Sequence, residues 1–265
     1  MNKNKGSILL IVIAILAIGG GVFIYNKKGS FDTSKTIKID KQENNEKCKT
    51  DGSETALLCD LSTAYSYGVN GKTAVIRLQG TLSNYYTKNK QDLNLLMSEI
   101  KNNTRPLEYR IFLIKILSTD KDNFSLIRKD LLSVISDRKN ADEIRAQMII
   151  TSPKIYSSIY HTTRVRDNND LFETLISILN ENNEKLSSAV INSMFGYMAN
   201  LDEQRAVDVI VDFASDYKNN YRNTPNTLAE SLLILKNSKK LTPLTTEAIK
   251  YVCDKNDSKN LLLCR

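Results

Sequence analysis

The 265-residue chain contains no tryptophan and only one histidine, His161. A single histidine excludes any metal site that needs several imidazole ligands. It is also the one side chain whose unperturbed pKa suits proton transfer near neutral pH. A Ser-His-Asp arrangement would use it with Ser157 or Ser158, but no nucleophile elbow accompanies these residues. We therefore expect His161 to be an ordinary, partly exposed polar residue.

Cysteine is scarce as well, with four residues in two equally separated pairs: Cys48 with Cys59, and Cys253 with Cys264. A structural zinc site uses closely spaced Cys-x2-Cys pairs, so this pattern does not predict zinc. Four cysteines allow three pairings, and the local one gives two short disulfide loops. Disulfides persist in oxidising compartments, so local pairing places the domain outside the cytoplasm. Four reduced thiols in a cytosolic protein are the alternative.

Acidic residues are absent from the first 28 positions, which accounts for much of the basic charge. Lys3, Lys5, Lys27 and Lys28 flank an apolar segment and supply more than half of the formal net charge of +7. Nucleic-acid binding needs a concentrated basic stripe with stacking aromatic residues. Lysine and arginine instead alternate with acidic residues along the rest of the chain, so we expect no nucleic-acid partner.

The apolar segment, residues 8–25, contains no charged side chain. As a helix it spans roughly 27 Å, which just crosses the hydrocarbon core of a bilayer. The alternative is a cleaved signal peptide, because a short basic start precedes the segment and Ala17-Ile18-Gly19 is a small-x-small triplet. The apolar run continues past Gly19, and this favours an uncleaved transmembrane anchor.

Positive charge lies on both sides of the anchor, so charge alone leaves its orientation open. Local pairing of the cysteines favours a domain outside the cytoplasm. We therefore expect a single-pass protein of a bacterial inner (cytoplasmic) membrane. Its large domain would lie in the periplasm or outside the cell. We divide the chain into an anchor or uncleaved signal with basic flanks (1–28), a polar linker (29–50) and a helical domain (51–265).

Proline does not interrupt the periodic segments of this domain. Val207, Ile210, Val211 and Ala214 repeat with the i, i+3, i+4, i+7 spacing of an amphipathic helix, and similar segments recur along the chain. An all-α fold follows. The four prolines, at positions 106, 153, 225 and 243, are expected at helix edges. Residues 224 and 242, both threonine, would cap the helices that follow them.

Pairs of helices are expected to begin at nearly regular intervals, near Lys72, Pro106, Ala141, Asp170 and Asp202. This spacing predicts antiparallel helical hairpins in an array that resembles an α-solenoid of the HEAT or tetratricopeptide kind in shape only. The tetratricopeptide signature residues are absent. Between residues 63 and 78, an Asn-Gly turn makes a small β-hairpin possible instead.

Three short motifs have part of a known site but lack the companion residues. Gly71-Lys72-Thr73 matches the end of a phosphate-binding loop, with Ser66 where the loop needs glycine or alanine. Ser98 and Lys101 have the spacing of a Ser-Lys nucleophile without its other elements. Residues 167–170 are oxygen-rich but lack the alternation and glycine of a calcium loop, and we expect them to start a helix. The sequence thus predicts no nucleotide, metal or cofactor.

The expected function is a membrane-tethered, extracytoplasmic helical module that binds another protein, such as an envelope-complex subunit or an immunity-type inhibitor. Tyrosine occurs twelve times against seven phenylalanines, and tyrosine is favoured at interfaces. We assign no catalytic residue and expect no enzyme. The alternative is an envelope hydrolase whose catalytic residues are dispersed along the sequence.

Overall fold

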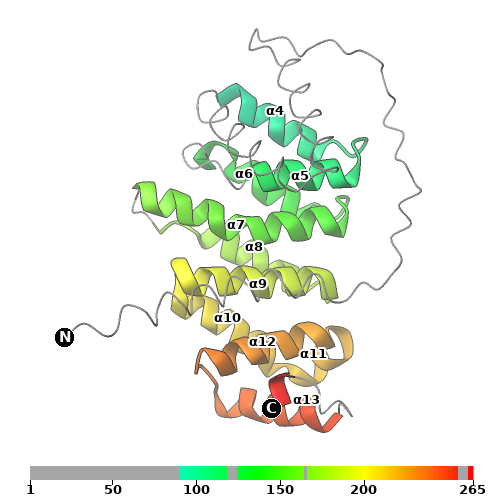
Figure 1. The fold of residues 1–265 in the computed structure, drawn as a ribbon, viewed down its shortest axis with the longest axis vertical. Helices are drawn as coiled ribbons and strands as arrows, with labels where there is room; N and C mark the ends of the chain where they lie inside the picture. The colour runs from blue at the N-terminus through cyan, green and yellow to red at the C-terminus, as the bar shows by residue number, and fades with distance from the viewer. Residues whose placement is uncertain (1–89, 118–123, 164–165, 256–261, 265) are drawn as a thin grey trace, which may run out of the picture. The chain divides into compact units, whose positions relative to one another are not determined.

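The computed structural model describes residues 90–117, 124–163, 166–255 and 262–264. These residues form ten α-helices and one short 3-10 helix, with no strand, so the predicted all-α class is confirmed for this part of the chain (Figure 1). The helices are α4 (Lys90–Lys101), α5 (Leu107–Leu117), α6 (Phe124–Ser136), α7 (Asp142–Thr163), α8 (Asn169–Leu179), α9 (Glu184–Asn200), α10 (Glu203–Ser215), α11 (Tyr217–Asn223), α12 (Pro225–Asn237), α13 (Pro243–Lys255) and η1 (Leu262–Cys264).

Several predicted features lie outside the described residues. They are the anchor (8–25) with its flanking lysines, the linker (29–50), the possible β-hairpin (63–78) and the cysteine pair at positions 48 and 59. Among the helices that the structure describes, none is both long and apolar enough to cross a membrane.

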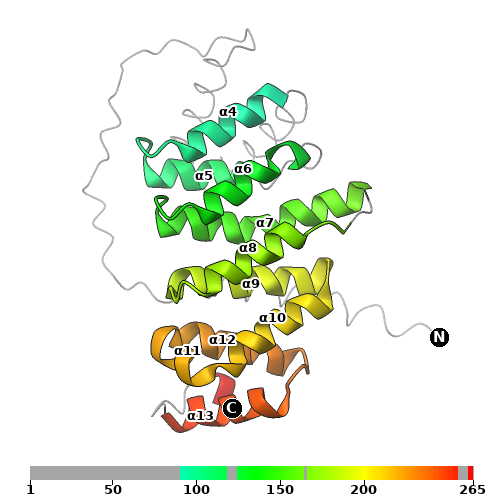
Figure 2. The same cartoon turned by 180° about the vertical axis from the view of Figure 1, so that it is seen from behind.

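The helices alternate between two layers (Figures 1 and 2). In the first layer α5, α7, α9 and α12 pack against one another in that order. In the second layer α4 packs against α6, α6 against α8, and α10 against α13. Each helix of one layer also packs on a chain neighbour in the other, whereas the short α11 contacts α10 and α12.

Four predicted pair starts coincide with helix starts to within one residue, at Leu107, Asp142, Asn169 and Glu203. They are not equivalent members of one repeat, however. The first two begin helices of the first layer, and the other two begin helices of the second layer. The nearly regular spacing of the predicted pair starts therefore combined helix starts of the first layer with helix starts of the second layer.

The core runs between the layers and consists of the periodic apolar positions. On α10, Val207, Ile210 and Ala214 are buried, as the sequence predicts, and Val211 is half-buried against them. On α8, Leu171 and three further residues are buried. Each fully buried leucine or isoleucine contributes about 1.5–3 kcal/mol, so packing between the layers outweighs intrinsic helix propensity.

The two predicted threonine caps differ from each other. Thr242 and Thr245 cap α13 reciprocally, because each backbone N–H donates to the other hydroxyl at 2.8 and 3.2 Å. Thr224 precedes Pro225 at the start of α12 as expected, but its hydroxyl donates back to the carbonyl of Asn220. Thr224 is therefore not a side-chain cap, although α12 does begin at the proline.

The prediction that Pro153 lies at a helix edge is wrong, because it lies inside α7. Proline has no N–H for the carbonyl four residues earlier, that of Ile149. The hydroxyl of Ser152 donates to this carbonyl at 2.6 Å and replaces the missing bond. The proline ring packs on α9 at Gly196, where a Cβ atom would lie 3.4 Å from the Cβ of Pro153. A Cβ at position 196 would thus touch the proline ring, and a side chain larger than that of alanine would push against it.

Gly196→Val should lower the free energy of unfolding by about 1–3 kcal/mol, because its methyl groups would push against Pro153. The matched control is Ala199→Val, an exposed position on the same helix. Helix propensity alone would favour the Gly196 variant over the control. Urea denaturation measures the free energy of unfolding of both variants. Equal values would contradict a tight contact between α7 and α9.

Candidate functional site

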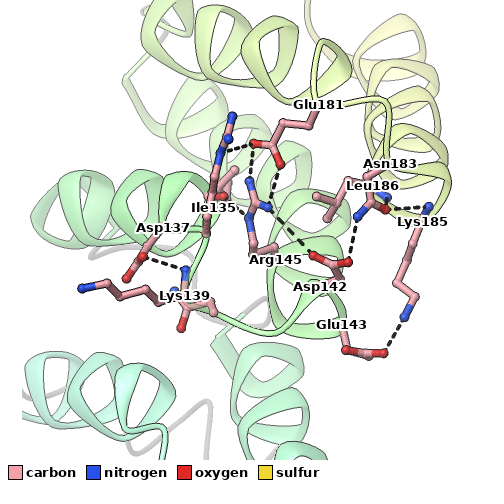
Figure 3. Close-up of polar contacts among 12 residues, drawn as sticks. Ile135, Asp137, Lys139, Asp142, Glu143, Arg145, Glu181, Asn183, Lys185 and Leu186 are labelled. Carbon is pink, nitrogen blue, oxygen red and sulfur yellow. Dashed lines mark hydrogen bonds and ion pairs between the residues drawn. The ribbon is translucent and has the colours of Figure 1, made fainter.

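A buried arginine joins α6, α7 and the loop between α8 and α9 (Figure 3). Arg145 lies near the start of α7, and its side chain is only 3% exposed. Its Nε donates to the carbonyl of Ile135, in the last turn of α6, at 2.7 Å. Its two Nη atoms donate to the two carboxylate oxygens of Glu181 at 2.9 and 2.7 Å. This bidentate geometry fixes the loop and both helices relative to one another.

The electrostatics of this site keep Glu181 ionised. Hydrogen bonds from Arg145 lower the pKa of the Glu181 carboxyl below its usual value, and the nearby charges of Arg145 and Arg138 act in the same direction. The carboxylate is 14% exposed. A carboxylate held in this way does not act as a proton donor near neutral pH, so the pair is structural.

Polar contacts continue from this pair to the starts of α7 and α9. The Asn183 side chain caps α9 by accepting from the backbone N–H groups of Lys185 and Leu186. Its amide nitrogen donates to Asp142 at 2.7 Å. The Lys185 ammonium pairs with Glu143 on α7 (Figure 3). The helix starts of two successive pairs are therefore held together.

Arg110 makes equivalent contacts one helix pair earlier. Its Nε donates to the carbonyl of Ile100 at 2.6 Å, and an Nη donates to the side-chain oxygen of Asn140 at 2.9 Å. In both sites the carbonyl belongs to the residue ten positions before the arginine. Arg110 is 4% exposed, and burial lowers the pKa of its guanidinium. We name Arg110 and Arg145 the joint arginines.

The joint arginines were not predicted from the sequence, although it contains a signal for them. Ser98, Ile100 and Arg110 repeat as Ser133, Ile135 and Arg145 with the same internal spacing. A search for repeated polar residues inside apolar segments would have found this pattern. Only the fold shows that each arginine reaches back to the isoleucine carbonyl.

The acidic segment 167–170 binds an arginine of a neighbouring helix. Arg128 on α6 donates to both carboxylate oxygens of Asp170 at 2.6 Å and to Asp167 at 2.9 Å. These contacts raise the pKa of the guanidinium and lower that of Asp167. The segment does start a helix, as predicted. α8 begins at Asn169, and the side chain of the preceding Asn168 makes no capping hydrogen bond.

The Ser98–Lys101 motif, which we did not expect to be a nucleophile, has no free amine. Lys101 forms an ion pair with Asp130 on α6, whereas a Ser-Lys mechanism needs an uncharged lysine. Ser98 is exposed beside it in a shallow hollow. His161 lies on α7, but its side chain is outside the described residues.

Several of the tyrosines belong to the core. Tyr156 and Tyr217 are 4% and 5% exposed, and their hydroxyls donate to Asp170 and Glu247. Tyr197 is fully buried with its ring 4.7 Å from that of Phe172. These tyrosines fill the space between helices, so their number is no direct measure of an interface.

The predicted disulfide between Cys253 and Cys264 is present, with Cα atoms 5.7 Å apart. It fastens η1 to α13. Among the described residues, no group of three or more histidine, cysteine or acidic side chains is arranged to hold a metal ion. A comparison with family models, curated proteins and solved structures finds no match for this chain.

The environment of Glu230 on α12 shifts its pKa in the opposite direction to that of Glu181. It accepts hydrogen bonds from the uncharged side chains of Ser188 and Asn192 on α9. Burial raises its pKa, and the nearby carboxylate of Glu184 adds to this effect. Glu184 in turn accepts from the backbone N–H of Thr227 at 3.0 Å, in the first turn of α12.

Arg145→Met should lower the free energy of unfolding by about 3 kcal/mol, because it leaves Glu181 and the Ile135 carbonyl without their buried donor. The matched control is Arg138→Met in the same site, whose side chain is 78% exposed. Chemical denaturation of both variants measures the difference. Similar losses would show that exposed charge around Glu181, and not the buried arginine, stabilises this joint.

The two glutamates should respond to pH in opposite directions. Glu181 has a lowered pKa, so its contribution is present near neutral pH and is lost below about pH 4. Glu181→Gln should thus destabilise the fold at pH 7 and should have a smaller effect in acid.

Glu230 has a raised pKa, so ionisation of its carboxyl disfavours the fold above that pKa. Glu230→Gln should stabilise at pH 7, and the gain should shrink as pH falls. Unfolding curves of both variants at pH 7 and in acid test the direction of each change in stability.

Proposed function

We propose that this chain is a membrane-tethered, extracytoplasmic protein-interaction module whose helices form an α-solenoid-like scaffold. The main support for the proposal is a set of half-buried polar and apolar side chains at helical spacing on three helices that pack in succession in the first layer. They are Gln147 and Ile150 on α7, Ser188, Asn192 and Phe195 on α9, and Glu230 and Leu233 on α12. We name this the α7–α9–α12 face.

The composition of this face suits protein recognition. Specific interfaces combine apolar contact area with polar groups that fix register. Ile150, Phe195 and Leu233 supply the apolar area, and the polar side chains alternate with them along the helices. Ser188 already bridges α9 to Glu230 on α12. A surface built from backbone that is held in place loses little entropy on binding.

Two further observations support the proposed membrane-tethered, extracytoplasmic location. Residues 8–25 are uncharged and long enough for a membrane anchor, with lysines on both sides. The disulfide between Cys253 and Cys264 fits an oxidising compartment. The partner in this proposal is another envelope protein, either a subunit of a complex or an enzyme that the module inhibits.

Photo-crosslinking in native membranes tests this proposal. A photoreactive amino acid in place of Gln147 or Leu233 on the α7–α9–α12 face should give one discrete adduct with the same partner. The controls are Ser177 on α8 and Lys250 on α13, which are exposed on the second layer. Mass spectrometry identifies the adduct. Adducts of equal yield from the control positions, or none from the face, would contradict the proposal.

A further inference from the structure

The last described segment of the chain covers the end of the helical array. Residues Leu262–Cys264 form η1, which packs on both α12 and α13. Leu263 is 2% exposed and belongs to the core, whereas its neighbour Leu262 is 68% exposed. One leucine is therefore inserted at the seam of α12 and α13.

Only two other attachments hold η1 in place among the described residues. Cys264 is bonded to Cys253 in α13, and the Lys236 ammonium on α12 donates to the Leu263 carbonyl at 2.9 Å. The lysine contact is partly exposed to solvent. The covalent bond is thus the stronger of the two attachments.

Without the disulfide, the remaining contacts are too few to keep η1 docked. A single 3-10 turn has poor hydrogen-bond geometry and does not persist by itself in water. Burying one leucine offsets the loss of backbone freedom of only one or two residues, and η1 has three. The disulfide favours the docked state of η1, because it keeps the segment close to its site even when it is undocked.

We propose that η1 is a redox-controlled latch over the seam between α12 and α13. A dithiol reductant supplies two electrons and two protons, which convert the disulfide into the thiols of Cys253 and Cys264, while the reductant becomes a disulfide. Leu263 then leaves the core, and the apolar surface beneath it becomes exposed. Because η1 packs on α12 and α13, the helices from α5 to α9 stay folded.

Hydrogen exchange followed by mass spectrometry on the full chain, with and without dithiothreitol, tests the latch. Reduction should speed exchange at least about tenfold in the C-terminal halves of α12 and α13, because this region then opens locally. Peptides from α7 and α9 should not change. Unchanged exchange in α12 and α13 would overturn the proposal. A comparable rise in α7 and α9 would also overturn it, since the disulfide would then stabilise the whole array.

Two sets of variants separate the latch from other effects. The double variant Cys253→Ser/Cys264→Ser should show fast exchange without reductant, and adding reductant should change nothing further. A further change would assign the effect to Cys48 and Cys59. With the disulfide intact, Leu263→Ala should speed exchange in α12, whereas Leu262→Ala, at the exposed neighbour, should not. Equal effects of the two substitutions would contradict insertion of Leu263.

Discussion

Two buried arginine contacts to backbone carbonyls set the position of one helix pair on the next in the α4–α9 region. Arg110 and Arg145 each reach back to the end of the preceding helix and forward to the loop that follows the next helix. A guanidinium is suited to this task, because its rigid fork donates in several directions at once. Removing such a group leaves buried carbonyls and a carboxylate unpaired, which costs more than the net gain from forming the bonds.

The α7–α9–α12 face depends on this geometry. The joint at Arg145 fixes the starts of α7 and α9, and further along the same helices Pro153 packs on Gly196. Two separate constraints along one helix pair define both its spacing and its register. The side chains that α7 and α9 contribute to the face are therefore presented by backbone that is fixed at both places, which would lower the cost of ordering them in the proposed complex.

Periodicity was enough to predict helices, because their apolar faces and their starts are local properties. The starts at Leu107 and Glu203 were predicted to within one residue. The layer of each helix was not, because it depends on contacts between distant segments. Pro153 misled the prediction, since the hydroxyl of Ser152 compensates locally for the missing donor. The roles of the joint arginines could not be predicted from spacing alone, because their acceptors are main-chain atoms that every sequence possesses.

The most direct test of the joint is native-state hydrogen exchange on Arg110→Met. We predict faster exchange in the last turn of α6 and in the loop at residues 137–140, since Asn140 loses its buried donor. Exchange in α12 and α13 should stay as in the unmodified chain. A uniform rise along the whole array, or no change near Asn140, would contradict the claim that a buried arginine couples successive helix pairs.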